Sequence, residues 1–257
     1  MDELPSFDLS GQVALVTGAG RGLGRSIALA LANAGADLAL GLRDVGRDDG
    51  VVEAVERLGR RAIRLPMDVT NLPQSYAAIE AAISHYERID ILVNNAGGSI
   101  IDAAIDAQEA DFDTVIGLNV KSTFFLSQRV AKHMIERGGG GRIINMSSQA
   151  GAVALPGEAI YCLAKAAVSH LTRCLAVEWG PHGINVNAVA PTFIETPGTA
   201  PALSDAAFRA DTVERVAALH RVGRPVEVAG AVVYLASPAA SLVTGHTLMI
   251  DGGWTVR

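Results

Sequence analysis

Seven short apolar segments recur along the chain, each bounded by Gly, Asp, Asn or Pro. They are rich in Val, Ile, Leu and Ala and nearly continuous, which is typical of strands buried on both faces of a parallel sheet. We expect these strands within residues 12–18, 36–42, 61–68, 89–97, 141–148, 183–191 and 246–253.

Longer segments with apolar residues at helical spacing lie between these strands. They predict helices over Leu23–Ala34, Val51–Leu58, Pro73–Tyr86, Phe112–Ile135, Ala159–Trp179 and Val226–Ala236. The alternation predicts an α/β fold: a single Rossmann-like, doubly wound domain over residues 1–257, with about seven parallel strands and helices on both faces.

One segment, residues 195–211, interrupts this alternation and is rich in Pro, Thr, Ala and Ser. Its position after a strand favours a substrate flap over the carboxyl ends of the strands, where open α/β sheets bind ligands. An ordinary surface loop is the alternative.

Composition and charge narrow the class of protein. Apolar residues make up 49% of the 257 residues and charged residues 19%, which favours a large buried core over disorder. The net charge of −6 and the lack of a dense Lys/Arg run argue against a nucleic-acid partner. Residues 1–12 carry acids where a signal peptide carries bases, and no stretch reaches about 18 uninterrupted apolar residues. We therefore expect a soluble, cytoplasmic protein with no membrane partner.

The two cysteines and six histidines indicate neither a disulfide nor a metal site. Cys162 and Cys174 both fall on a predicted helix, where a separation of 12 residues places them about 18 Å apart. The histidines lack metal-ligand spacing, so we expect no metal.

A glycine-rich turn, TGAGRGLG at residues 17–24, follows the first predicted strand directly. Its glycines at 18, 22 and 24 permit a sharp turn and a close approach of the backbone to a pyrophosphate, towards which the next helix points its N-terminus. A turn that serves packing alone is the alternative, but the strand before it and the amphipathic helix after it favour dinucleotide binding.

The TGxxxGxG spacing resembles the cofactor motif of the short-chain dehydrogenase/reductase family. The resemblance continues in order along nearly the whole chain, through Asp68-Val69, NNAG at 94–97, Asn119, Ser148, Tyr161-x-x-x-Lys165, Asn187, Pro191, Thr196 and Asp251-Gly252-Gly253. It implies an NAD(P)-dependent oxidoreductase that transfers hydride between a nicotinamide and a secondary alcohol or ketone.

By this resemblance, Asp68 holds the adenine amino group, Val69 braces the ring and residues 95–97 lie along the adenosine ribose. Pro191 to Thr196 resemble the segment that touches the carboxamide, although Thr192 stands where the family usually has Gly. The expected cofactor-binding residues are Gly18, Arg21, Gly22, Leu23, Gly24, Arg43, Asp68, Val69, Asn95, Ala96, Gly97, Tyr161, Lys165, Pro191, Thr192, Ile194 and Thr196.

The end of the second predicted strand bears on the choice between NADP and NAD. NAD-preferring members usually place an acid there to accept hydrogen bonds from the ribose 2′-hydroxyl, but this chain has Leu42 followed by Arg43. Arg43 and Arg21 together favour NADP(H), because two guanidinium groups suit a 2′-phosphate. Asp44 leaves the alternative open: it can neutralise Arg43 or, with a one-residue shift, take the acid's role. Arg21 also occurs in NAD-type loops.

The predicted catalytic residues are Asn119, Ser148, Tyr161 and Lys165. Tyr161 and Lys165 are four apart on a predicted helix and share a face, and we expect Lys165 and an oxidised nicotinamide to favour the phenolate of Tyr161, the general acid/base. Ser148 donates to the substrate oxygen. By resemblance, Lys165 also bonds the nicotinamide ribose and Asn119 holds a water linked to Lys165. For Asn119, Tyr161 and Lys165, the alternative is a position on a solvated helix face.

Two resemblances point to different substrate classes. The segment 177–197 resembles sugar-acid and polyol dehydrogenases, whereas the whole chain also resembles 3-oxoacyl-carrier-protein reductases. We place a small polar hydroxy or keto compound first, an acyl thioester second, and a non-catalytic NAD(P)-sensing protein as an alternative of another class. The resemblance also implies a homotetramer, with helices around Asn119 and Tyr161 at one interface and residues 245–257 at another.

Overall fold

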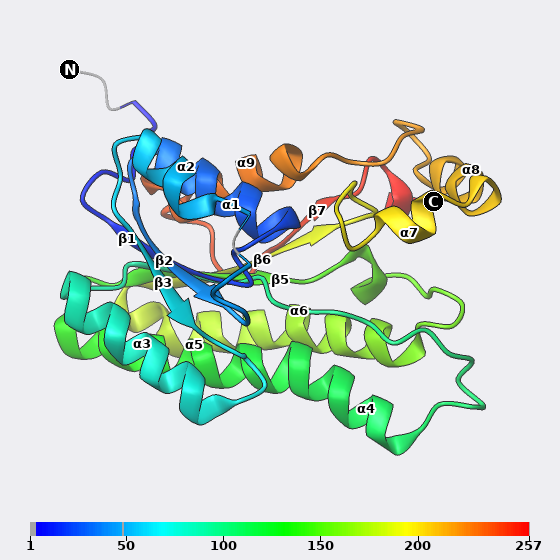
Figure 1. Ribbon diagram of the computed structural model, residues 1–257, viewed down its shortest axis with the longest axis horizontal. Helices are drawn as coiled ribbons and strands as arrows, with labels where there is room; N and C mark the ends of the chain where they lie inside the picture. The colour runs from blue at the N-terminus through cyan, green and yellow to red at the C-terminus, as the bar shows by residue number, and fades with distance from the viewer. Residues whose placement is uncertain (1–3, 48, 257) are drawn as a thin grey trace.

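Seven parallel strands form one sheet in the order β3-β2-β1-β4-β5-β6-β7 (Figure 1). They are β1 (Val13–Thr17), β2 (Asp37–Leu42), β3 (Ala62–Pro66), β4 (Ile91–Asn94), β5 (Gly141–Met146), β6 (Ile184–Pro191) and β7 (Thr247–Ile250). The predicted strands and the predicted doubly wound α/β fold are thus confirmed. The chain runs outward from β1 to β3 and returns to β4, so the strand order reverses between β1 and β4 and a ligand-binding crevice is expected at their carboxyl ends.

This computed structural model describes residues 4–47 and 49–256. The first three residues of the acidic N-terminal stretch and the last residue of the segment 245–257 therefore lie outside the described residues.

The sheet is covered on both faces (Figure 1). One layer contains α1 (Gly22–Asn33), α2 (Val51–Arg57) and α9 (Pro225–Ala236), and the other contains α3 (Leu72–Tyr86), α5 (Ser122–Arg137) and α6 (Ala159–Trp179). Within β1, Ala14 and Val16 pack into the first layer and Val13 and Leu15 into the second. Because both faces of the strand are buried, it is apolar at every position, which is why the sequence shows runs and no alternation.

The segment predicted as one helix over Phe112–Ile135 is divided among three elements. It consists of α4 (Glu109–Ile116), a π-helical turn η1 (Gly117–Lys121) and α5. Hydrophobic spacing does not distinguish an inserted π turn from a continuous helix, because the apolar stripe resumes after one extra residue.

The segment 195–211, predicted as a substrate flap, contains one short helix and the first part of a second. These are α7 (Ala200–Leu203) and α8 (Ala206–Arg215). The Asp205 carboxylate caps α8 by accepting a hydrogen bond from Phe208 N at 2.8 Å. The alanines of this segment suit a helix, and this cap fixes the residue at which α8 begins. The segment follows β6 and lies beyond its carboxyl end (Figure 1).

Helix α6 is long and apolar enough, by length and composition alone, to cross a membrane; the segment Ala159–His182 has a mean hydropathy of 1.2. It packs against β6, carries the buried Lys165 and is one of the helices that cover the sheet. Cys162 and Cys174 lie on it as free cysteines, which agrees with the expectation that they do not pair.

Candidate active site

The glycine-rich loop after β1 has the backbone that the sequence predicts. Gly18 and Gly22 adopt φ of +64° and +57°, which favours glycine. A Cβ on Gly24 would overlap the Gly18 carbonyl oxygen and lie 2.6 Å from Asn95 Nδ2. The first turn of α1 therefore packs directly against the loop, and only glycine fits at position 24.

Segments far apart in the sequence meet at this loop. Thr17 Oγ1 accepts hydrogen bonds from the backbone N–H groups of Asn95 and Ala96, both at 3.0 Å, and Asn95 Nδ2 donates to the Thr17 carbonyl oxygen at 2.9 Å. On the other side, a Cβ on Gly22 would lie 3.5 Å from Thr196 Cβ. The side chain of Asn95 thus holds the loop in place, and the cradle left open by the glycines suits a dinucleotide pyrophosphate.

The end of β2 lies beside the glycine loop, because Ala19 N donates to the Gly41 carbonyl oxygen at 3.2 Å. Leu42 is the last residue of β2 and Arg43 follows it, exposed and without an ion pair among the described residues. Asp44 turns into its own loop, where Oδ1 accepts from Gly46 N at 3.0 Å. Strand β2 therefore ends at Leu42, as predicted, and Arg43 is the next residue.

Asp68 and Val69 follow β3 and lie near the same edge of the sheet. One carboxylate oxygen of Asp68 accepts hydrogen bonds from the backbone N–H and the hydroxyl of Thr70, at 3.0 and 2.7 Å. Val69 is buried. Part of the Asp68 carboxylate is therefore used to form the turn that leads into α3.

Tyr161 and Lys165 lie on one face of α6, as their spacing predicts. Lys165 Nζ lies 5.4 Å from the centre of the Tyr161 ring. It donates to the Met146 carbonyl oxygen at 2.8 Å, and its side chain is buried. The lysine therefore ties α6 to Met146 at the end of β5, two residues before Ser148.

The pKa of Tyr161 differs from the expectation. Burial raises it to about 12, and hydrogen bonding with Ser148 opposes the rise; Lys165 does not lower it in the protein without cofactor. Its amino group is directed at the Met146 carbonyl, and burial lowers the pKa of Lys165 itself to about 8. Activation of the phenol thus requires a change in this environment, such as a bound cofactor.

A residue that the sequence reasoning missed lies next to Ser148. Ser148 Oγ donates to Gln149 Oε1 at 2.7 Å, and the Ser148 hydroxyl is also bonded with Tyr161. Because a hydroxyl has one proton, Ser148 must turn away from Gln149 before it can donate to the Tyr161 oxygen or to a substrate. The only available signal was adjacency to the predicted catalytic serine.

Asn119 lies inside the π turn η1 and is buried, which excludes a solvated position on the helix surface. Its amide Nδ2 donates to the carbonyl oxygens of Gly98 and Val115, at 2.8 and 2.9 Å. A Cβ on Gly97 would lie 2.8 Å from Asn119 Oδ1 and 3.3 Å from Lys165 Nζ. The π turn therefore brings Asn119 and Lys165 to the same glycine after β4.

The segment after β6 completes the arrangement. Thr192 N donates to the Ile250 carbonyl oxygen at 3.2 Å, and Thr192 Oγ1 is buried without a hydrogen-bond partner in the part of the chain that is described. Ile194 is buried, and its carbonyl oxygen accepts from Thr199 Oγ1 at 2.5 Å. The backbone thus continues smoothly despite Thr192, and the predicted groups gather at the carboxyl ends of the strands.

Stability should rise with pH because of Lys165. Its pKa is about 8 in the folded protein and about 10.4 in an unfolded chain, so between these values only the unfolded chain holds the proton. Tyr161, with its pKa raised to about 12, begins to lower stability only above about pH 10. Relative to Lys165→Met, the free energy of unfolding should gain on the order of 2 kcal/mol from pH 8 to 10 in denaturant titrations without cofactor. Parallel pH curves for the two proteins would contradict this.

Known proteins are similar to the chain over nearly its whole length. The family described as enoyl-(acyl carrier protein) reductase matches residues 18–255. A 2-dehydro-3-deoxy-D-gluconate 5-dehydrogenase of Escherichia coli K12 is 41% identical, with 99% of each chain covered. A D-threitol dehydrogenase of Mycolicibacterium smegmatis is 38% identical, covering 98% of this chain and 95% of the relative.

Solved structures are also similar to the chain over nearly its whole length. A gluconate 5-dehydrogenase from Burkholderia cenocepacia J2315, in complex with NADP and tartrate, superposes with a TM-score of 0.93, 36% identity and 98% of each chain covered. A 7α-hydroxysteroid dehydrogenase complexed with NADH has a TM-score of 0.91 and 35% identity, again with 98% of each chain covered. The similarity therefore extends over both the cofactor end and the segment beyond β6.

Proposed function

Because the chain belongs to the short-chain dehydrogenase/reductase family, we propose that its substrate is a small polar hydroxy or keto compound, such as a polyol or sugar acid. The chain is an NAD(P)-dependent oxidoreductase that acts on secondary alcohols and the corresponding ketones. When bound, the nicotinamide supplies or accepts the hydride.

One observation carries the proposal: the buried Lys165 Nζ lies 5.4 Å from the centre of the Tyr161 ring, and the same amino group approaches Gly97 in the segment after β4. In the proposed roles, Tyr161 gives a proton to the carbonyl oxygen during reduction and takes it back during oxidation. Ser148 turns its hydroxyl from Gln149 to the substrate oxygen and stabilises the charge that develops there. Lys165 bonds the nicotinamide ribose, and Asn119 holds a water beside Gly97 for proton exchange with solvent.

The proposal is tested by following nicotinamide absorbance with polyols, sugar acids, diketones and acetoacetyl thioesters, each with NAD(H) and NADP(H). We expect turnover within the polyol and sugar-acid arms. Turnover confined to the thioester arm would identify a 3-oxoacyl thioester reductase instead. Cofactor binding without turnover of any compound would identify a sensor, which has no need of a proton donor.

We propose that the chain prefers NADP(H). Arg43 and Arg21 are exposed, and the loops that carry them meet at the bond between Ala19 and Gly41. Asp44 is used within its own turn and forms no ion pair with Arg43 among the described residues. The arginines are therefore free to bind a 2′-phosphate.

Arg43→Ala should weaken NADPH binding about ten- to hundredfold while changing NADH binding less than about twofold, because only NADPH carries the phosphate. Dissociation constants from nicotinamide fluorescence measure this. Arg47→Ala, which removes an exposed arginine from the same loop, is the matched control. An equal effect of Arg43→Ala on both cofactors would overturn the preference.

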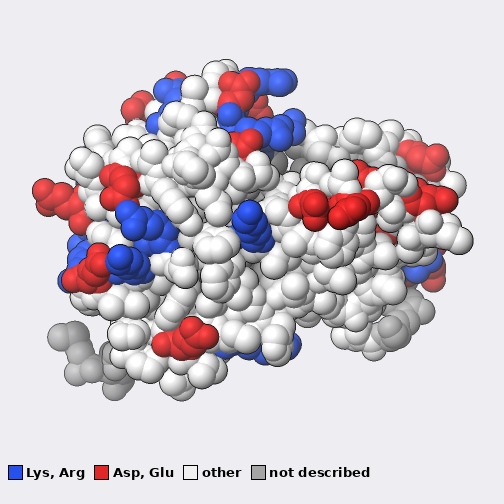
Figure 2. Space-filling model, turned by 90° about the horizontal axis from the view of Figure 1, so that it is seen from below, with Lys and Arg blue, Asp and Glu red and all other residues white. Residues whose placement is uncertain are grey.

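We also propose a cytoplasmic homotetramer. Leu163 and Val177 on α6 are 50% and 79% exposed, and β7 is an edge strand. Figure 2 shows the layer of α3 to α6 from below, with charged side chains mainly along the margins and broad uncharged areas between them. Such a face suits a subunit interface. Free cysteines suit a reducing compartment. The mass in solution tests the assembly.

A further inference from the structure

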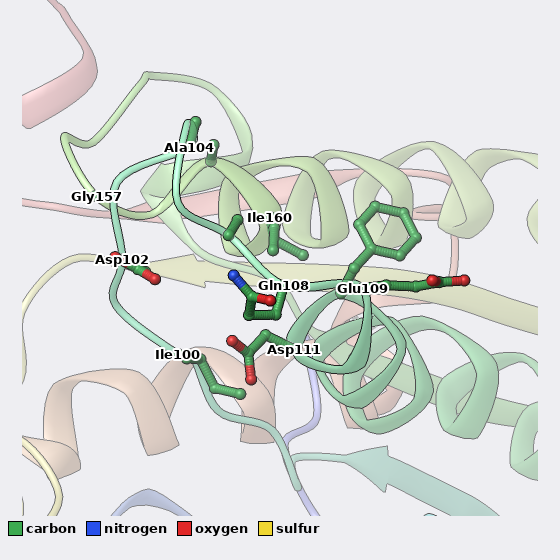
Figure 3. A pocket seen from close by; sticks show the side chains of 11 residues that line it. Ile100, Asp102, Ala104, Gln108, Glu109, Asp111, Gly157 and Ile160 are labelled. Carbon is green, nitrogen blue, oxygen red and sulfur yellow. The ribbon is translucent and has the colours of Figure 1, made fainter.

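Two surface cavities of the protein carry opposite charge. The first, of about 360 Å³, lies between the loop after β4, α4 and the start of α6 (Figure 3). Its lining includes the carboxylates of Asp102, Glu109 and Asp111 and, among the described residues that form it, no Lys, Arg or His. The second, of about 500 Å³, lies between α8 and the residues before α9, and arginines predominate there. This basic cavity is lined by Glu195, Arg209, Val213, His220, Arg221, Val222 and Arg224.

The basic cavity is separate from the candidate active site, because none of its lining residues is among the predicted catalytic or cofactor-binding residues. Two segments supply its side chains: the stretch from the end of β6 through α8, and the residues just before α9. A short parallel bridge between Ile194 and Gly223 joins these segments, and Glu195 N donates to the Gly223 carbonyl oxygen at 2.9 Å. Helix α8 is packed towards the bridge by Phe208, whose ring centre lies 5.4 Å from that of Phe193.

Two of the three arginines are paired with carboxylates. Arg221 donates from Nη1 and Nη2 to the two carboxylate oxygens of Glu227, at 2.9 and 2.6 Å. The backbone N–H of Arg224 donates to the same carboxylate at 2.7 Å, so both oxygens of Glu227 are occupied. Hydrogen bonding from Arg221, followed by that from Arg224 N, lowers the pKa of Glu227 to about 2, and this carboxylate stays ionised at neutral pH. Arg209 Nη2 donates to Glu195 Oε1 at 2.8 Å.

Positive charge is left over in the basic cavity. The Arg224 side chain is exposed and forms no ion pair with any residue that the structure describes. Arg209 uses one N–H in its ion pair, whereas a guanidinium carries five donors. Three arginines against two carboxylates therefore leave one excess cation, and donors of both Arg209 and Arg224 remain available to a ligand. The exposed ring of His220 adds a further nitrogen to the same lining.

We propose that the basic cavity binds a phosphoryl group, either as inorganic phosphate or as the phosphate ester of a small molecule. A phosphoryl group is close to a dianion at pH 7 and has three acceptor oxygens, which suits donors from several side chains, whereas a carboxylate is matched by one guanidinium fork. A volume of about 500 Å³ leaves room for the organic part of an ester. A phosphoryl group bound by Arg209 and Arg224 ties α8 to the start of α9. This site goes beyond the proposed oxidoreductase function and does not depend on it.

The test is a calorimetric titration with inorganic phosphate of protein saturated with NADP⁺, so that the phosphate-binding groups of the cofactor site are already occupied. NaCl keeps the ionic strength constant, because exposed charges are screened by salt. We expect saturable binding that Arg224→Gln weakens at least about tenfold, by removing the arginine that has no ion pair. Arg215→Gln is the matched control: it removes an exposed arginine of α8 that pairs with Asp211 and does not line the cavity. Its dissociation constant should stay within about twofold of the wild type.

Glycerol 3-phosphate and acetate identify the ligand. Tighter binding of glycerol 3-phosphate than of inorganic phosphate would identify an ester as the ligand, and equal binding would identify the phosphoryl group alone; both support the site. Acetate that binds as tightly as phosphate would overturn the phosphoryl assignment.

The site itself is overturned if phosphate shows no saturable binding at constant ionic strength, or if Arg224→Gln binds it as the wild type does. It is also overturned if Arg215→Gln weakens binding as much as Arg224→Gln, because the effect is then one of general charge. Slower amide hydrogen exchange of residues 206–215 with phosphate, in the wild type but not in Arg224→Gln, is expected from the link between α8 and α9. None of these measurements follows turnover, so their failure leaves the proposed function intact.

Discussion

Replacement of Tyr161 by Phe should lower kcat by about a thousandfold, which is typical of the loss of a general acid/base. The substitution removes a single oxygen atom, the one that is bonded with Ser148. The ring over which Lys165 Nζ lies at 5.4 Å remains, so the packing of α6 should be preserved. Cofactor dissociation constants should stay within about twofold, since the phenol contributes a proton and little binding energy. Single-turnover kinetics with the best substrate of the screen, together with fluorescence titration, measure both quantities.

Tyr76→Phe is the matched control, because Tyr76 is a partly exposed tyrosine on α3, away from the crevice. It should retain wild-type kcat. A Tyr161→Phe protein that keeps most of its activity would refute the assignment of the proton donor. A protein that also loses cofactor binding would show that the hydroxyl acts in binding, so that the loss of turnover no longer identifies an acid/base.

The strands and most helices could be predicted because buried positions require apolar residues, and the spacing of these residues differs between strands and helices. Strand β2 shows this: five of its six residues are buried, and its only partly exposed member is the first. The π turn at Gly117–Lys121 could not be predicted in this way, because it adds one residue to a helix without changing the types of residue in it. Helix α8 was missed because its cap at Asp205 lies inside a segment whose Pro, Ser and Thr content is also typical of loops.

The candidate site was predictable as a set of positions but not as a set of contacts. Spacing along α6 places Tyr161 and Lys165 on one face, and parallel strands bring the residues that follow them to one edge. The direction of the Lys165 amino group towards Met146 depends on how α6 docks on β5, a tertiary feature without a local pattern.

Gly24→Ala should disrupt the cofactor end of the protein. Gly24 lies in the first turn of α1, and an added methyl group would overlap the Gly18 carbonyl oxygen and lie 2.6 Å from Asn95 Nδ2. Gly18 belongs to the loop itself and Asn95 anchors it, so relief of the clash must move the backbone that forms the cradle. We expect a loss of about 2–3 kcal/mol in the free energy of unfolding, typical of overpacking, and at least tenfold weaker binding of both NADPH and NADH.

Gly230→Ala is the matched control for this substitution. Gly230 is an exposed residue within α9, and a Cβ there would meet no atom within 4 Å. Because Ala is the better helix former, this change should raise the free energy of unfolding by about 0.5–1 kcal/mol and leave cofactor binding unchanged. If the two Gly→Ala substitutions change the free energy of unfolding in opposite directions, the effect of Gly24→Ala comes from steric contact and not from helix propensity. A Gly24→Ala protein that binds both cofactors as tightly as the wild type would show that the loop adapts, and that the contact between α1 and Gly18 does not position the pyrophosphate.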